Sequence, residues 1–340
     1  MNGLSKKIYG VAVAALAVLL PVAGVAQTTV RIGFFPNITH AQALVGQAGG
    51  DYQLALGQNN PIDWKQFNAG PSVIEALYAG AIDIAFIGPS PTISGYVKSG
   101  GAALRVIAGA SSGGAELVVR NGANIHGPND FHGKTVATPQ LGNTQDVALR
   151  EWLASHNLKT TEKGGDVRVL PTENPDQLTL FLKGQLDAAW APEPWATRLV
   201  HDGGGNILVD ERDLWPNRQF TAAHVIVSTK FLQSHPELVK KFLQAHVHVT
   251  EWIQAHPAEA KALINSQIQK ATGKALPAVI LNEAYSRLDV TYDPIASSVY
   301  TSAQHSVDAG FLRTLPDLSH LYDLTLLNQV LAEQNKKPIR

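Results

Sequence analysis

Residues 77–91 read LYAGAIDIAFIGPSP, and residues 181–195, which lie 104 positions further along, read FLKGQLDAAWAPEPW. The two stretches share a gapless pattern in which four pairs of residues agree in type: Gly80 with Gly184, Asp83 with Asp187, Ala85 with Ala189 and Phe86 with Trp190. Pro71 and Pro175 are related by the same offset, and each opens a stretch with a helical pattern. Because a repeated α/β unit indicates two similar lobes, we expect a ligand site in the cleft between them.

Strand-like and helical patterns alternate along both halves of the chain. In the first half we predict strands at 30–35, 82–87 and 104–108, and helices at 41–47 and 72–79. In the second half we predict strands at 135–138, 167–170, 186–191 and 207–209, and helices at 144–155 and 177–182. Such alternation is typical of a largely parallel, doubly wound sheet in each half. Asp83 and Asp187 recur at matching strand starts, so we expect them to cap or fix turns.

These patterns divide the mature chain into two lobes of the α/β class. We predict that lobe one comprises residues 28–118 and 222–340, and that lobe two comprises residues 119–221. The chain then crosses between the lobes twice, and two strand-like crossings make a hinge rather than a flexible tether. Beyond an apolar strand at 222–227 the pattern is helical, and its apolar stripe is expected to pack on lobe one. The stripe residues are Leu238, Val239, Phe242, Leu243, Val249 and Ile253.

Residues 1–26 have the order of a secretory signal peptide. Two lysines precede an apolar run at 8–20, and the small residues Gly24, Val25 and Ala26 follow. This run is too short for a membrane span, which needs about 20 apolar residues. We predict that the mature protein begins at Gln27 in a bacterial periplasm. Because the chain has no cysteine, a lipid anchor on an N-terminal Cys is excluded, and we expect a soluble protein.

Charge and motif content exclude several classes of function. The whole chain carries a formal charge of −1, and without the two lysines of the signal peptide it carries −3. No basic stretch with interleaved aromatic residues is present, so nucleic acid is not an expected partner. The chain contains no HExxH, GxSxG or Walker motif and no cysteine nucleophile. His246 and His248 lie two apart on a predicted helix, so they point to different faces and make a poor metal pair. We therefore expect no enzymatic activity, no metal and no cofactor.

Four loops lead from a predicted strand into a predicted helix: 36–40, 88–92, 139–144 and 192–195. In open parallel sheets ligands bind at such places, beyond the carboxyl ends of the strands. Each loop offers unpaired backbone N–H groups and the positive end of a helix dipole, which together favour an anion. None of the four contains Lys or Arg, so the anion is expected to be held without a cationic side chain.

Side chains in these loops have alternative roles. Further donors are offered by Thr39, Ser90, Thr92, Asn143 and Thr144, although the same groups also serve as ordinary helix caps. The aromatic residues that border the loops either cover an organic tail or belong to the core: Phe34, Phe35, Trp190 and Trp195. Trp195 is favoured as a ligand contact because Pro192 and Pro194 stiffen the loop that presents it. Glu193 either accepts from a ligand amine or is a solvated acid in a first helical turn.

Four motifs resemble those of one family. They are GFFPNITHAQ at 33–42, EALYAGAIDIAFIGPSP at 75–91, GKTVATPQLGNTQDVALREWL at 133–153 and LKGQLDAAWAPEPWATRL at 182–199. The chain resembles the periplasmic solute-binding proteins of ABC importers, in the branch that takes aliphatic sulfonates, taurine or nitrate. The resemblance covers nearly the whole mature chain. It implies a type II periplasmic binding protein, in which two doubly wound α/β lobes, joined by two hinge strands, close like a Venus flytrap on an anion.

Carried over position by position, the family's ligand loops fall on 36–40, 90–91, 142–144 and 193–195 with Trp190. With the donors named above, the candidate ligand-binding residues are Pro36, Asn37, Thr39, His40, Ser90, Pro91, Thr92, Gln140, Gly142, Asn143, Thr144, Trp190, Glu193 and Trp195. The third loop departs from the sulfonate and taurine relatives, which often read Gly-Ser-Ser/Thr-Ala-His. Here Asp146 stands in place of that His, and a carboxylate that faced the cleft would repel an anion.

The resemblance implies a monomeric, non-enzymatic receptor of an ABC transporter. Such a protein captures a small organic anion, in the first place an alkyl sulfonate, and delivers it to a membrane permease with a cytoplasmic ATPase. One alternative is a binder of a neutral or cationic heterocycle, such as a thiamine precursor, which is favoured if Glu193 and Asp146 both face the cleft. The other is an enzyme of the same fold, such as a desulfinase, which relies on a Cys nucleophile that this chain lacks.

Overall fold

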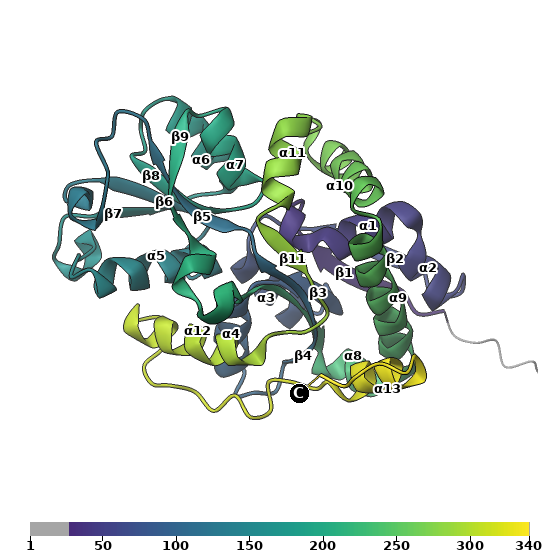
Figure 1. The fold of residues 1–340 in the computed structure, drawn as a ribbon. Helices are drawn as coiled ribbons and strands as arrows, with labels where there is room; N and C mark the ends of the chain where they lie inside the picture. The colour runs from purple at the N-terminus through teal and green to yellow at the C-terminus, as the bar shows by residue number, and fades with distance from the viewer. Residues whose placement is uncertain (1–26, 340) are drawn as a thin grey trace, which may run out of the picture.

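A computed structural model describes residues 27–339, and the predicted signal peptide lies outside this range. The described chain forms two sheets, each covered by helices, side by side in one molecule (Figure 1). No helix within residues 27–339 is both long enough and apolar enough to span a membrane. The predicted α/β class with two lobes is confirmed.

The first sheet has six strands in the order β11-β4-β10-β3-β1-β2. Their bounds are β1 Val30–Phe34, β2 Ile62–Gln66, β3 Ile84–Ile87, β4 Leu104–Gly113, β10 Thr221–Ser228 and β11 Leu288–Val290. The second sheet has five strands in the order β7-β6-β8-β5-β9. Their bounds are β5 Ala115–Arg120, β6 Thr135–Thr138, β7 Arg168–Pro171, β8 Ala188–Pro192 and β9 Gly205–Asp210. In each sheet three parallel strands, β2-β1-β3 and β7-β6-β8, are followed by an antiparallel strand, β10 or β5.

The repeat seen in the sequence is reproduced by the strand register. Ile32 pairs with Ile84 in the first sheet, and Val136 pairs with Ala188 in the second, so both partners shift by the same offset. Helices α3 Gly70–Tyr78 and α6 Asn174–Leu182 have bounds related by that offset as well. A duplicated unit therefore builds the parallel part of both sheets.

Asp83 and Asp187 fix the chain at matching places in the two sheets. A carboxylate oxygen of Asp83 accepts the backbone N–H of Arg31 at 2.9 Å, and one of Asp187 accepts that of Thr135 at 2.9 Å. Each aspartate also meets a guanidinium, from Arg31 and from Arg120 respectively. Both residues thus have structural contacts, but they tie neighbouring strands together rather than cap a helix or fix a turn as predicted.

The chain changes sheet twice. It passes from β4 to β5 at Gly114 and returns between the ends of β9 and β10, at 211–220. If each strand is assigned to the lobe whose sheet it joins, the boundary that we propose between the lobes lies at Gly114, a few residues before the boundary at 118 that we predicted. The segment at 211–220 contains two short 3-10 helices, η4 Glu211–Leu214 and η5 Pro216–Arg218.

Helices complete the two lobes and bridge them. The remaining ones are α1 Ala41–Gly49, α2 Asp51–Leu56, α4 Pro89–Lys98, α5 Thr144–Ser155, α7 Trp195–His201, α8 Thr229–Ser234, α9 Pro236–Ala255, α10 Pro257–Thr272, α11 Ala278–Tyr285, α12 Ala296–Asp308 and α13 Thr325–Glu333, with 3-10 turns η1 Ile38–His40, η2 Pro128–Phe131 and η3 Thr161–Lys163. The predicted apolar stripe of α9 is buried in the core of the first sheet. Two later helices also reach the second sheet's lobe, because α11 contacts α7 and α12 contacts α5 (Figure 1).

Candidate functional site

A small cavity lies where the loops of the two lobes meet, and we call it the central cavity. Residues from both sides of the cleft line it: Phe35, Asn37, Thr39, His40, Asn68, Gly88, Asn143, Thr144, Gln145, Asn174, Pro192 and Ala222. The space open to the centre of a water molecule is about 20 Å³. That is room for one or two waters or for the head group of a small ligand, and not for a complete organic molecule.

Helix N-termini surround the central cavity. Its lining residues stand at the starts of η1, α5 and α6, directly before α4, and shortly before α3. The first N–H groups of a helix have no partner within the helix, and the helix dipole places positive charge at this end. No Lys, Arg, Asp or Glu lines the cavity. The site is therefore suited to an anion that is bound by neutral hydrogen-bond donors.

Two polar atoms at the cavity have no hydrogen-bond partner within the described residues. They are Oγ1 of Thr144 and Oδ1 of Asn174, and both are buried. A buried polar group without a partner costs about 1–3 kcal/mol, so such groups are rare unless a ligand or water completes them. The two residues begin α5 and α6, both in the lobe of the second sheet, so each atom is placed where a ligand or water in the cavity could complete its hydrogen bonds.

His40 is a neutral member of the site. Its ring stacks on Phe35 with 4.4 Å between ring centroids, and its Nδ1 accepts the backbone N–H of Phe35 at 3.2 Å. Complete burial lowers the pKa of His40 to about 3, because the charged form loses its hydration. Since Nδ1 is an acceptor, the proton lies on Nε2, and His40 offers one more neutral donor.

Direct hydrogen bonds close the cleft around the cavity. The indole Nε1 of Trp195 donates to Oδ1 of Asn37 at 3.1 Å, from the second sheet's lobe to the first. The backbone N–H of Gly70 donates to Oδ1 of Asn143 at 3.2 Å, and that of Ile38 donates to the carbonyl of Glu193 at 3.1 Å. The molecule is thus in a closed arrangement, in which loops of both lobes share their hydrogen bonds.

The predicted site residues fall into four groups. Five of them line the central cavity: Asn37, Thr39, His40, Asn143 and Thr144. Others flank it without lining it: Ser90, Pro91 and Thr92 in the first turn of α4, and Gln140 and Gly142 before α5. Thr92 is occupied by partners of its own, since its hydroxyl donates to the carbonyl of Gly88 and bonds Nε2 of His224 at 2.8 Å.

Pro36 and Trp195 line a second, larger space, which we call the side groove. Its volume is about 510 Å³. Its walls come from the loop after β1, from α6 and α7, and from the end of α10 with the segment that leads to α11. Asn68 lines both the side groove and the central cavity, so the two spaces share a wall.

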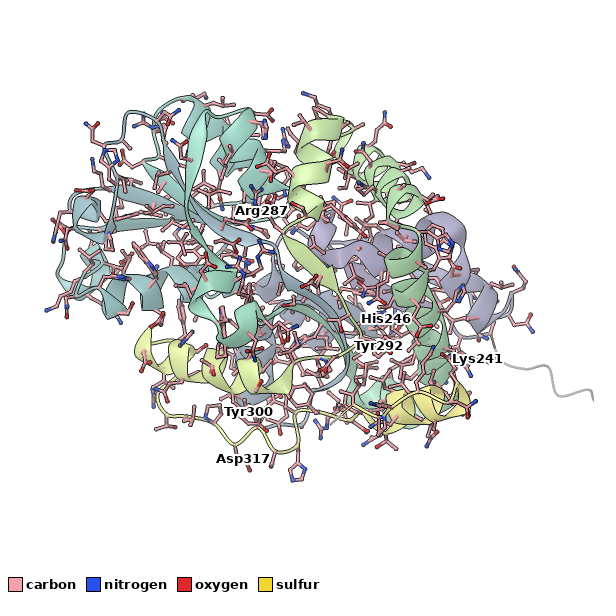
Figure 2. The ribbon with its side chains drawn as sticks, viewed as in Figure 1. Lys241, His246, Arg287, Tyr292, Tyr300 and Asp317 are labelled. Carbon is pink, nitrogen blue, oxygen red and sulfur yellow. The ribbon has the colours of Figure 1, made fainter. Side chains whose placement is uncertain are left out.

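Trp190 and Glu193 do not reach the central cavity, and their predicted place at the ligand needs correction. Trp190, a residue of β8, points into a core of the second sheet's lobe, and its Nε1 donates to Glu211 at 2.8 Å. The carboxylate of Glu193 accepts the backbone N–H of Thr197 at 3.0 Å and the Nη1 of Arg287 at 3.0 Å. Figure 2 labels Arg287 where α11 approaches α7. This ion pair lies between the lobes and turns the acid away from the ligand site.

Asp146 is also directed away from the cavity. Its carboxylate accepts the hydroxyl of Thr138 at 2.9 Å, the backbone N–H of Gly142 at 2.8 Å and Nε of Arg150 at 3.1 Å. These three bonds hold the loop after β6 and neutralise the acid. The condition that favoured a cationic ligand, namely two carboxylates facing the cleft, is therefore not met.

Asn68, Gln145 and Asn174 line the cavity but were not among the predicted site residues. Asn68 lies in the loop that leads from β2 into α3, and Asn174 is the first residue of α6, which follows β7. The repeated Pro71 and Pro175 mark these two helix starts in the sequence. Extending the rule for strand-to-helix loops to the outer strands would have found both residues.

The two similar lobes, joined at two crossings and meeting at a cavity lined by neutral donors, have the periplasmic binding protein fold. The chain belongs to the NMT1-like family, whose family model matches residues 23–268. It is 26% identical over 218 residues to the taurine-binding periplasmic protein of Escherichia coli strain K12. That alignment covers 63% of this chain and 64% of the relative, which is just under two thirds of its length.

Solved structures show the same fold. The alkanesulfonate-binding protein of Xanthomonas axonopodis pv. citri, bound to MOPS, aligns with a TM-score of 0.69 at 19% identity, over 89% of this chain and 97% of that chain. The periplasmic nitrate-binding protein of Synechocystis PCC 6803 aligns with a TM-score of 0.75 at 16% identity, over 90% of this chain and 89% of that chain. The resemblance to the sulfonate, taurine and nitrate branch is confirmed.

Proposed function

We propose that this chain is the substrate-binding component of an ABC import system. It captures a small organic anion, in the first place an aliphatic sulfonate, and delivers it to a membrane permease with a cytoplasmic ATPase. The protein acts as a soluble periplasmic monomer after cleavage of its signal peptide, and it catalyses no reaction. The observation that carries this proposal is a cavity built from the helix N-termini of both lobes, with no charged side chain in its lining.

The proposed mechanism is a shift between open and closed lobes. Donors from the loops before α1 and α4 lie on one side of the cavity, and donors of α5 and α6 lie on the other. An anion touches both sets only when the cleft is closed, so it stabilises that state by its extra contacts. The hydrogen bonds of Trp195 to Asn37 and of Gly70 to Asn143 then close the lobes around it. A permease recognises the closed form.

The proposal is supported by the chemistry of the cavity and by the relatives. The neutral donors include the unpartnered hydroxyl of Thr144 and the protonated Nε2 of His40. The taurine-binding relative and the alkanesulfonate-binding structure are named for sulfonates. With Asp146 and Glu193 engaged by Arg150 and Arg287, no carboxylate opposes an anion at the cavity.

Thermal shift and titration calorimetry of the mature chain test the proposal. We expect aliphatic sulfonates to raise the melting temperature, because a ligand that binds only the folded state stabilises it by RT ln(1 + [L]/Kd). Nitrate, taurine, sulfate and thiamine serve as comparisons. Thr144→Val should weaken sulfonate binding about tenfold by removing one donor, whereas Thr301→Val, at an exposed site on α12, should not. Stabilisation by thiamine and by none of the anions would contradict the proposal.

A further inference from the structure

Glu116 is a buried acid beside the hinge that the proposed binding site does not use. It lies in β5, just after the crossing at Gly114, and it has no exposed surface. Within the described residues, neither of its carboxyl oxygens has a hydrogen-bond partner. A buried carboxylate that is neither paired nor hydrogen-bonded is so costly that the group takes up a proton instead.

The charged groups that surround Glu116 are already paired with one another. Asp210 of β9 lies opposite Glu116 in the strand register, and Arg212 donates to this aspartate at 2.6 Å. Arg287, which follows α11, donates to Glu193 at 3.0 Å. Each of the two cations near Glu116 therefore has another carboxylate as its partner. An ionised Glu116 would add an uncompensated negative charge to these pairs.

The surroundings of the two buried glutamates differ in how well they stabilise a charge. Complete burial and the neighbouring Glu193 raise the pKa of Glu116 well above its ordinary value, although the charge of Arg287 opposes them. Burial raises the pKa of Glu193 as well, but hydrogen bonds from Thr197 and Arg287 oppose this rise. Glu116 is therefore the member of the pair that holds a proton.

The groups around Glu116 come from both lobes. The backbone N–H of Gly114 donates to the carbonyl of Arg287 at 2.9 Å, and the carbonyl of Gly114 accepts the N–H of Glu193 at 2.9 Å. Glu193 belongs to the second sheet's lobe, whereas Arg287 directly precedes β11 of the first sheet. Opening of the lobes at this crossing brings water to Glu116, and a hydrated glutamic acid ionises near its ordinary pKa of about 4.3.

We propose that closure of the lobes takes up one proton, which is held on Glu116. This inference rests on the proposed function, because it concerns the same closing motion. At neutral pH the open form has lost this proton and the closed form keeps it, so a fall in pH favours closure. A ligand that selects the closed form is then bound more tightly at lower pH, by up to about tenfold per pH unit.

Two histidines near the lobe contacts are also titratable, so the test compares variants that retain both. Nε2 of His201 on α7 meets the carboxylate of Glu283 on α11, across the lobes. His40 is neutral in the closed arrangement, because burial lowers its pKa to about 3. Neither histidine differs between the wild type and Glu116→Gln. The difference between these two proteins therefore isolates Glu116.

Titration calorimetry with methanesulfonate measures the proton uptake. The titration is run at pH 6.5 in cacodylate and in imidazole, because these buffers have different ionisation enthalpies. The wild type should take up about one proton more than Glu116→Gln. Between pH 8 and pH 6 its affinity should also rise about tenfold more than that of the variant. Glu75→Gln, at an exposed site on α3, is the matched control and should behave like the wild type.

The outcomes separate this inference from the proposed function. Equal proton uptake by the wild type and Glu116→Gln would overturn the inference and leave the function intact. If no aliphatic sulfonate binds, the proposed function fails, and urea denaturation of the ligand-free protein decides the inference. The wild type should then lose stability relative to Glu116→Gln from pH 5 to pH 8, because the folded chain keeps a proton that the unfolded chain loses. Parallel curves would refute it. Glu116→Met, which is also uncharged, takes the place of Glu116→Gln if the buried amide impairs folding.

Discussion

Replacing Gly88 by alanine should impair ligand binding by obstructing closure. Gly88 has φ −78° and ψ 164°, a conformation that alanine adopts without strain. A Cβ placed there would lie 2.2 Å from Oγ1 and 3.3 Å from Cβ of Thr144, which belongs to the opposite lobe. Atoms at such distances overlap, so either the lobes stay apart or Thr144 rotates its hydroxyl away from the cavity. Both results remove binding energy.

The expected loss follows from the size of this overlap. One added methyl group in a well-packed site costs about 1–3 kcal/mol, which corresponds to a dissociation constant raised about fivefold to 150-fold. Titration calorimetry with an aliphatic sulfonate measures this constant, and small-angle scattering with saturating ligand measures closure. The stability of the ligand-free variant should stay near that of the wild type if the free lobes are open.

Gly127→Ala is the matched control for this experiment. Gly127 has φ −168°, and a Cβ added there would meet no atom within 4 Å. This variant should bind and close like the wild type. Wild-type affinity and full closure in Gly88→Ala would refute the reasoning, because they would show that the ligand is bound without the contact between Gly88 and Thr144.

Three further predictions concern the lobe contacts and the buried charges. Trp195→Phe keeps an aromatic side chain but loses the indole N–H and its 3.1 Å hydrogen bond to Asn37. Calorimetry should show that sulfonate affinity falls about tenfold. An affinity equal to that of the control Trp252→Phe, a change in α9, would contradict this. Arg287→Met leaves Glu193 without its cation beside the buried Glu116. Urea denaturation should show that the free energy of unfolding falls by about 3–5 kcal/mol. The exposed Arg313→Met is the control, and an equal urea midpoint for the two variants would be evidence against a stabilising pair. Burial lowers the pKa of His40 and His224 to about 3 and that of His246 to about 4, so the unfolded chain binds protons first as the pH falls below about 6.5. The stability that these neutral rings contribute above that pH is lost toward pH 4, at up to about 1.4 kcal/mol per pH unit for each ring. If His246→Gln left the slope of the unfolding free energy against pH unchanged, that result would argue against this account.

The periodicity of the sequence predicted much of the fold because the formation of a strand or helix depends mainly on residues that are close together in the chain. Strands β1, β3, β6 and β8 were located by short apolar runs, and α3 and α6 by proline at their first turns. The repeat located Asp83 and Asp187 together, and their contacts with Arg31 and Thr135 follow from the register of adjacent strands. Each of these features requires only the period of a strand or helix and the chemistry of its ends.

The candidate site was predicted in part. The rule that ligands bind at strand-to-helix loops found Asn37, Thr39, His40, Asn143 and Thr144, all of which line the central cavity. It did not separate Trp195, which lies between the lobes, from Trp190, which lies in a core. The prolines of the loop favoured Trp195 as the ligand contact, but the family resemblance included both residues, and the packing of β8 and α7 is what places Trp190 in the core.

The sequence by itself determined the α/β class and the duplicated unit, which follow from local periodicity, and it predicted an anion site from the uncharged helix starts. Only the tertiary structure decided the surroundings of the acids. Glu193 pairs with Arg287, which lies 94 residues away, and Asp146 closes its own loop with Arg150. Whether a carboxylate opposes an anion depends on a cation brought near it by folding, because electrostatic interactions act through distance in space and not along the chain.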